Sequence, residues 1–257
     1  MRKAIVLLVA GFMIAGTAQA AEAKSYSVTI SASKTSLELG QTFKLTGKVS
    51  PAAKKKRVKI QRRYEGGGWR TIKTVKLSSK SRYSYTVKPT RGGPTDYRVQ
   101  KPASGGRSAK TSATKRVDVF RWRSLQQFPV TGYPVVYGTR GIGGTAFPAS
   151  AALNGQDATW TFGGQRCTTF RTSIGVDDAS TAGVTSDPNF MWNQNITGQQ
   201  MFQLSPKNSG LTTGQNPRSF VEAIPADKTT LYLNSVFGGA VGTRLLTLGT
   251  PELRCNS

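Results

Sequence analysis

The sequence predicts an all-β protein made of two β-sandwich domains. Apolar and polar residues alternate one by one through most short segments, which is the period of a strand with one buried face. Glycine and proline, 28 and 12 of the 257 residues, separate these segments as turns. No amphipathic helical period follows the first 20 residues, so we expect sheets to form both cores.

The N-terminus has the pattern of an export signal. Arg2 and Lys3 precede an apolar run over residues 4–14, and Ala18-Gln19-Ala20 matches a cleavage site. Residues 1–20 therefore predict a secretory signal peptide. A membrane anchor is the competing interpretation, but the run is shorter than the roughly 20 residues that a spanning helix needs. We expect a secreted mature chain, extracellular or associated with the cell wall, without a transmembrane segment.

The positive charge of the chain is concentrated in its first half. About 237 residues remain after the signal peptide, enough for two domains, which we place at residues 24–119 and 122–257. Residues 24–118 hold 24 Lys and Arg against four acidic residues, whereas residues 119–257 hold 10 against seven. The formal net charge of +24 therefore belongs mainly to the first domain.

The first domain is a series of short alternating strands with cations on the polar face. Candidate strands are residues 26–31, 42–49, 57–64, 69–77, 82–88, 95–101 and 114–119. About seven strands in about 95 residues is the pattern of an immunoglobulin-like (Ig-like) sandwich, here without an internal cysteine pair.

Three motifs of this domain add a resemblance. Leu39-Gly40-Gln41-Thr42, Val58-x-Ile60-Gln61-Arg62-Arg63 and Gly68-Trp69-Arg70 resemble the small Ig-like domains of secreted proteins from high-GC Gram-positive bacteria. The resemblance implies a spacer or adhesion module. It would also place Tyr97 at the tyrosine corner of the sixth strand, with an ordinary core tyrosine as the alternative.

The second domain is organised around residues 160–178, WTFGGQRCTTFRTSIGVDD. Phe170 and Ile174 alternate with polar residues, so this segment predicts a half-buried strand. Trp160 and Phe162 alternate in the same way before a Gly163-Gly164 turn, which predicts a hairpin.

Cys167 lies on the predicted strand, and the only other cysteine is Cys255. An even pair of cysteines in an exported protein is most simply a disulfide. The bond would tie the last strand of the chain to this one.

Motifs of the second domain resemble a known family. The Gly-Gly turn followed by F-x-T-x-I-G-V-D-D is similar to the signature strand of the NPCBM family of carbohydrate-binding modules, found beside glycoside hydrolase domains. Gly141-Ile142-Gly143-Gly144 with Phe147-Pro148-Ala149-Ser150 resembles the family's approach to that strand, and residues 248–253 resemble its closing strand. The resemblance covers about residues 122–255 and implies a galactose-binding-like jelly roll. Gly249 and Thr250 replace the family's aspartate-containing turn.

The remaining segments of this domain show weaker periods. Residues 128–148 carry three prolines and many glycines, which predicts ordered loops with one short strand near residues 135–137. Later strands are expected at residues 200–204, 219–224, 229–235 and 243–248. We expect the boundary between the domains at residues 119–123, where no Pro/Ser linker is present, so the domains could pack closely or share a strand end.

The chain contains no histidine, which removes the commonest general base and His-ligated zinc. No phosphate-binding or dinucleotide fingerprint is present, and the acidic residues of the second domain show no spacing typical of a glycosidase pair. We therefore expect no enzymatic activity and no established cofactor. Asp177 and Asp178 are interpreted as a solvated strand end, as hydrogen-bond acceptors for sugar hydroxyls, or as ligands of a calcium ion.

Aromatic residues supply the second sugar-binding signal, because a ring face can stack on the C–H face of a pyranose. Tyr133 and Tyr137 lie in the loop-rich segment, and Trp192 lies in a polar run. Each could instead belong to the core. With Asp177 and Asp178 they form the predicted ligand site.

A cluster of cations forms a third candidate site, made of Lys54, Lys55, Lys56, Arg57, Arg62 and Arg63. An exported protein meets anionic wall polymers, and no nucleic-acid-binding fold or aromatic ladder accompanies the cluster. Solubility from surface charge is the simpler alternative. We expect a secreted, non-catalytic protein that binds polysaccharide or cell-wall glycan and is retained on anionic wall polymer. The alternative is a structural or adhesive surface protein that binds no free sugar.

Overall fold

The computed structural model describes residues 24–257 except 54–55, 155–156, 193–201 and 204–209. The predicted signal peptide lies outside these residues. The described chain is all-β, as predicted, with one short 3-10 helix at Leu125–Gln127. None of its helices is long and apolar enough to cross a membrane.

The first lobe packs two sheets around one apolar cluster. Its strands are β1 (Ser27–Val28), β2 (Ser31–Ala32), β3 (Ser36–Glu38), β4 (Phe43–Ser50), β5 (Arg57–Tyr64), β6 (Arg70–Lys76), β7 (Arg82–Val87), β8 (Gly93–Lys101) and β9 (Lys110–Thr111). One sheet joins β4 to β1, β2 and β7. The other follows the order β10-β8-β5-β6, where β10 is Lys115–Ser124. Strands β4 to β8 match the predicted segments closely. The expected first strand is interrupted between β1 and β2, and the short strands β3 and β9 were not predicted.

Tyr97 lies at the centre of this core and is fully buried, with its ring edge-on to Phe43 at 5.3 Å between centroids. Its hydroxyl has no hydrogen-bond partner among the described residues. The bond of a tyrosine corner is therefore missing, and the core interpretation is the correct one. Tyr83 makes such a backbone bond instead, donating to the carbonyl of Thr29 at 2.6 Å.

The second lobe is also built of two sheets around one core. Its strands are β11 (Val130–Gly132), β12 (Val136–Ile142), β13 (Thr145–Leu153), β14 (Ala158–Thr161), β15 (Cys167–Val176), β16 (Val184–Trp192), β17 (Phe202–Gln203), β18 (Leu211–Thr212), β19 (Arg218–Ala223), β20 (Thr230–Gly239) and β21 (Leu246–Cys255). In one sheet β21 lies between β15 and β13, and β19 extends it beyond β15. The other sheet follows the order β11-β14-β20-β16.

The predicted hairpin over residues 160–178 is wrong. Strand β14 pairs with β11 and β20, whereas β15 pairs with β19 and β21 in the opposite sheet. Trp160 and Phe170 are both fully buried between the sheets. Alternation therefore identifies which side chains of a strand face the core, but not the sheet to which the strand belongs. Gly164 and Arg166, both with positive φ, lie in the connection that crosses from one sheet to the other.

The prediction of loops over residues 128–148 is also wrong, because most of this segment forms β11, β12 and part of β13. The prolines occupy positions where a strand tolerates them. Pro129 and Pro134 lie outside the strands, and Pro148 lies where the β12–β13 register shifts, at a bulge. The glycine-rich Gly143-Gly144 pair has positive φ and forms the tight turn between β12 and β13.

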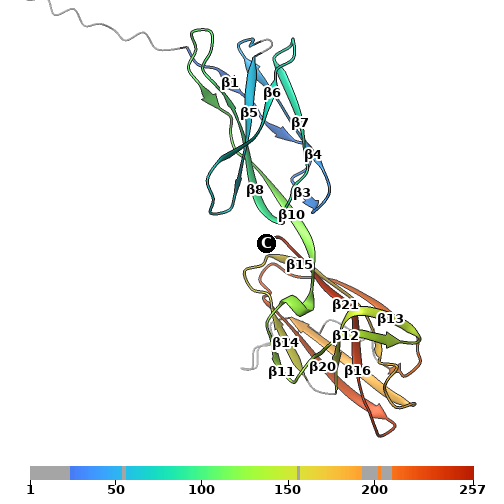
Figure 1. Cartoon of the computed structure of the whole chain (residues 1–257). Helices are drawn as coiled ribbons and strands as arrows, with labels where there is room; N and C mark the ends of the chain where they lie inside the picture. The colour runs from blue at the N-terminus through green and yellow to red at the C-terminus, as the bar shows by residue number, and fades with distance from the viewer. Residues whose placement is uncertain (1–23, 54–55, 155–156, 193–201, 204–209) are drawn as a thin grey trace, which may run out of the picture.

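One strand, β10 (Lys115–Ser124), belongs to both lobes. Its first half pairs with β8, and its last four residues pair with the end of β21, from Arg121↔Cys255 to Ser124↔Glu252. Figure 1 shows β10 leaving the first lobe and entering the second, with the C-terminus beside the junction. The predicted boundary therefore falls inside a strand, and the sheets of the two lobes are continuous.

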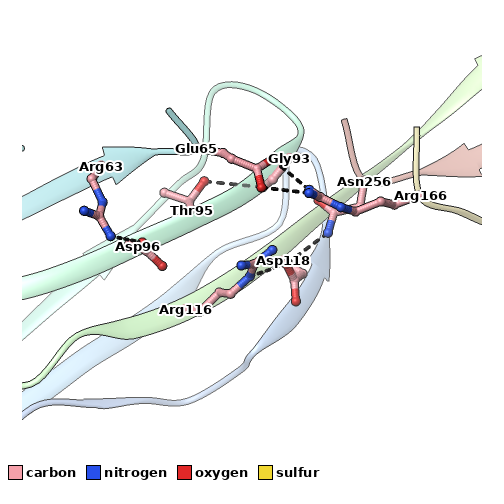
Figure 2. A network of polar contacts seen from close by, with 9 residues as sticks. All are labelled: Arg63, Glu65, Gly93, Thr95, Asp96, Arg116, Asp118, Arg166 and Asn256. Carbon is pink, nitrogen blue, oxygen red and sulfur yellow. Dashed lines mark hydrogen bonds and ion pairs between the residues drawn. The ribbon is translucent and has the colours of Figure 1, made fainter. Parts of the chain in front are cut away.

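Polar contacts reinforce this junction. Arg166 of the second lobe donates two hydrogen bonds to Glu65 of the first, at 2.7 and 2.8 Å (Figure 2). Asn256 donates to Asp118 at 3.0 Å, and Arg254 binds Glu38. The hydrogen bonds from Arg166 hold the pKa of Glu65 below its usual value. The two lobes are thus joined by backbone pairing and by side chains.

The predicted disulfide between Cys167 and Cys255 is present. The two cysteines are direct cross-strand neighbours on β15 and β21. The bond closes the end of the sheet that adjoins the junction, since Arg166 and Asn256 are the residues next to the two cysteines.

Candidate functional site

A groove of about 320 Å³ runs over the solvent-facing side of the second lobe, across β13, β21, β15 and β19. Its walls combine an ion pair, small hydroxyl side chains and exposed apolar surface. The lining residues are Phe147, Arg171, Thr172, Ser173, Ser219, Phe220, Val221, Gly249, Thr250 and Glu252. Its volume is at the lower end of the range for ligand pockets, roughly 300–1,000 Å³.

The ion pair lies between neighbouring strands. Arg171 of β15 pairs with Glu252 of β21, and its Nε and Nη2 donate to Oε2 of that carboxylate at 2.9 and 2.6 Å. Arg171 also stacks on the Trp122 ring, with the guanidinium carbon 3.8 Å from the ring centroid. Both bonds use Oε2, so among the described residues Oε1 of Glu252 has no hydrogen-bond donor. The pair can both donate to and accept from a polar ligand.

The apolar wall depends on a glycine. A Cβ atom at position 249 would lie 2.6 Å from the Phe147 ring, so Phe147 can lie on β21 only because Gly249 has no side chain. Val221 on the opposite side is 66 % exposed. The groove therefore offers uncovered apolar surface beside the ion pair.

Backbone strain borders the groove. Ala149 and Thr250 have φ values of 56° and 48°, in the left-handed region that residues other than glycine rarely occupy. Thr250 Oγ1 donates to the carbonyl of Pro148 at 2.9 Å, which joins the two strained segments. Such residues cost about 1–3 kcal/mol each and gather at functional sites.

The predicted carboxylates have structural roles. Asp177 is 2 % exposed, and its carboxylate accepts from Thr247 Oγ1 at 2.6 Å and from Ala179 N–H at 2.9 Å. The interpretation of Asp177 as a solvated or ligand-binding residue is therefore wrong. Asp178 is exposed but accepts from Gly144 N–H at 3.0 Å, and a Cβ at Gly141 would clash with its carboxylate oxygen. The glycines and the two aspartates thus hold the end of β15 against β21 and the β12–β13 turn.

The predicted aromatic residues do not form one site. Trp192 is 2 % exposed and packs edge-on against Phe162 and Phe170, so the platform interpretation is wrong and it belongs to the core. Tyr137 is half-buried, and its hydroxyl accepts from Trp160 Nε1 at 2.9 Å. Tyr133 is 50 % exposed and is the one predicted aromatic with a largely free ring.

The calcium interpretation finds no ligand cluster. Within the described ranges, no group of three or more His, Cys, Asp or Glu side chains could hold a metal ion. Asp177 already accepts hydrogen bonds on both carboxylate oxygens.

The predicted cationic cluster is spread along β5. Lys54 and Lys55 lie outside the described residues. Lys56 and Arg57 are exposed at the start of the strand, whereas Arg62 lies five residues further on, roughly 16 Å away at 3.3 Å per residue. Arg63 beside it is bound to Asp96 at 2.7 Å (Figure 2), and it also lies over the Trp69 ring. The four described residues of the cluster therefore do not lie together as one patch.

Sequence reasoning missed the groove because its residues come from four strands. A signal was present in Arg171 and Ser173, which mark the outward face of β15, but no sequence pattern shows that Glu252 is the partner of Arg171. That pairing depends on the register of β15 and β21, 81 residues apart.

No protein-family model matches the chain, and no curated protein matches it. Among solved structures, it is similar to the tandem CBM51 modules of Sp3GH98, the family 98 glycoside hydrolase from Streptococcus pneumoniae SP3-BS71. The identity is 11 %, over 78 % of this chain and 71 % of that chain, with a TM-score of 0.39. A second similar structure, of carbohydrate-binding modules of the β-sandwich superfamily, has 11 % identity over 91 % of this chain and 99 % of that one, with a TM-score of 0.27. Both likenesses are distant, and neither places a ligand on this chain.

Proposed function

We propose that this protein is a secreted, non-catalytic carbohydrate-binding protein whose second lobe binds a glycan in the groove over β15 and β21. The Arg171–Glu252 pair carries the proposal, because it places charged donors and a free acceptor oxygen beside exposed apolar surface. A sugar is complementary to this combination, because its hydroxyl groups can bond to the charged pair while its C–H faces lie on the apolar surface. Hydroxyl side chains of Ser173, Ser219 and Thr250 line the same groove and add further partners.

The expected affinity is low. A single shallow groove of this kind suits dissociation constants in the micromolar to millimolar range, equivalent to roughly 4 to 8 kcal/mol. The ligand would be a polysaccharide or cell-wall glycan, bound through a short stretch of its chain.

Retention on anionic wall polymer is the second part of the proposed function. The support is the excess of cations in residues 24–118, 24 against four acidic residues. Phosphate-bearing and carboxylate-bearing polymers would bind such a lobe with an affinity that falls as the salt concentration rises. No nucleic-acid partner is proposed.

Titration of the full mature chain with wall and plant oligosaccharides tests glycan binding. Ser219→Tyr is the blocking variant, because Ser219 is exposed and a ring there would fill the groove without entering the core. Tyr133→Ala is the matched control, since Tyr133 is exposed on the same lobe but lies outside the groove. We expect the Ser219 variant to lose binding and the Tyr133 variant to keep it. If the Tyr133 variant loses binding and the Ser219 variant keeps it, the site lies at Tyr133 and not in the groove. If no glycan saturates the chain, the structural or adhesive alternative is favoured.

A further inference from the structure

The first lobe has its own cleft, of about 410 Å³, at the end of β5. Three arginines line it, Arg62 from β5, Arg70 from β6 and Arg91 from the β7–β8 connection, together with Tyr64, Glu65 and the glycine turn 66–68. Arg70 and Arg91 are exposed, and Arg62 is half-buried. The cleft is thus positive and open to solvent.

Tyr64 holds two of these cations close together. The guanidinium carbons of Arg62 and Arg91 lie 4.3 and 4.2 Å from the centre of its ring. Cation–π contacts hold each side chain in place, yet the two positive charges are close enough to repel each other at physiological salt. Among the described residues, no carboxylate forms an ion pair with Arg62, Arg70 or Arg91. An anion bound between them would supply the missing counter-charge.

The one acidic residue of the cleft is already neutralised. Both carboxylate oxygens of Glu65 accept from Arg166, at 2.7 and 2.8 Å. The adjoining turn leaves room for a ligand, because Gly66 and Gly68 have no heavy atom within 4 Å of where a Cβ would lie. Three side chains are absent from this wall, so a polymer backbone could approach the arginines closely.

Neighbouring arginines have polar partners within the lobe, unlike the arginines that line the cleft. Arg63 is bound to Asp96 at 2.7 Å, and Arg98 donates to Gln61 at 2.8 Å. Both also stack on the Trp69 ring, at 4.8 and 4.1 Å. These cations have internal partners, whereas Arg62 and Arg91 have only the ring of Tyr64 among the described residues. Sequence alone could not separate Arg62 from Arg63.

We propose that Arg62, Arg70 and Arg91 form a binding site for the phosphodiester groups of a flexible polyol-phosphate polymer. This inference rests on the proposed retention on anionic wall polymer and names its site and its ligand chemistry. The planar guanidinium fork donates two hydrogen bonds to one phosphate, which makes arginine better suited than lysine to this task. Several arginines around one cleft would hold successive phosphates of the polymer.

Nucleic acid is the less suitable polyanion. Proteins that bind single strands stack bases on open aromatic rings. Here Tyr64 is already stacked against two guanidinium groups and Trp69 against two others. The arginines can reach a phosphodiester, but these rings are not free to receive bases.

Binding of the full mature chain to synthetic poly(glycerol phosphate), measured by titration at several salt concentrations, tests the proposal. Arg62→Gln and Arg91→Gln should each weaken binding about tenfold, as expected for loss of a charged hydrogen-bonded contact, and should lower the salt slope by about one. Arg63→Gln is the matched control on the same strand and should change affinity less than twofold. Arg62→Lys should bind with intermediate affinity, because it keeps the charge and loses the fork.

The outcomes separate this inference from the proposed function. If the chain binds the polymer but Arg63→Gln weakens binding as much as Arg62→Gln, the cleft is not the site, while retention by overall charge stands. If the chain binds no polyol phosphate but binds poly-glutamate, this inference fails while retention on anionic polymer stands. If it binds neither polymer, both fail, and glycan binding tested with Ser219→Tyr is unaffected. Equal arginine dependence with poly-glutamate would overturn the phosphodiester assignment. Tighter binding to single-stranded DNA of equal length would overturn the preference against nucleic acid.

Discussion

Replacing Tyr97 with phenylalanine should stabilise the first lobe. The Tyr97 hydroxyl is fully buried without a hydrogen-bond partner among the described residues, and leaving a buried polar group unpaired costs about 1–3 kcal/mol. Phenylalanine keeps the ring and its edge contact with Phe43 at 5.3 Å while it removes that cost. We expect the free energy of unfolding to rise by about 1 kcal/mol or more, which in a lobe of this size corresponds to roughly 4–8 °C in Tm.

Tyr83→Phe is the matched control, because Tyr83 is buried in the same core but donates to the Thr29 carbonyl at 2.6 Å. Loss of this hydrogen bond should lower the free energy of unfolding by about 1 kcal/mol. Urea denaturation of the full chain and the two variants, followed by near-ultraviolet circular dichroism, measures both effects. If Tyr97→Phe destabilises the protein as much as Tyr83→Phe does, the Tyr97 hydroxyl has a partner, and the tyrosine-corner interpretation would return.

Four further predictions follow from burial and bonding. Burial raises the pKa of Tyr83 and of Tyr97, so above pH 10 the unfolded state releases protons that the folded state keeps. The contribution of each tyrosine to the free energy of unfolding is complete below pH 10 and should fall by up to about 1.4 kcal/mol per pH unit above it. Denaturation measured at a series of alkaline pH values checks this. The fall of stability with pH should be less steep in Tyr97→Phe, and an unchanged steepness would contradict the prediction. Trp192→Ala should destabilise the second lobe by about 3–5 kcal/mol, whereas a normal Tm with loss of glycan binding alone would make Trp192 a platform. Reduction of the disulfide, which closes a sequence separation of 88 residues, should cost about 4 kcal/mol, and a denaturation midpoint unchanged by reductant would refute that value. Asp177→Ala should cost about 1–3 kcal/mol by leaving its buried donors unpaired, and calorimetry should show intact glycan binding; lost binding in a stable protein would restore its ligand role.

Most of the first lobe could be predicted from the sequence because local alternation determines its strands. Strand β5 was predicted at its observed bounds, and Val58 and Ile60 face the core as their spacing requires. In the second lobe the same rule located β15 but assigned it the wrong partner. Alternation reports which face is buried, whereas sheet membership is set by contacts between distant segments.

The sites were harder to predict for a related reason. Asp177 and Trp192 have side chains typical of sugar binding, yet both are buried, and burial depends on the whole fold. Arg62 and Arg63 are adjacent in sequence, yet Asp96 pairs with one and leaves the other in the cleft. Chemical type can be read from the sequence, but the accessibility and partners of a side chain cannot.

Strand β10 also fixes how far apart the two proposed ligand sites are. A flexible linker would let each lobe search for its ligand separately, but here a backbone strand paired on both sides of the junction joins them. Binding at two sites increases avidity by about 10² to 10⁴ only when one ligand can reach both at once. A wall surface that presents glycan and phosphate groups at the spacing set by β10 should therefore be held far more tightly than either polymer alone, and other spacings should give no such gain.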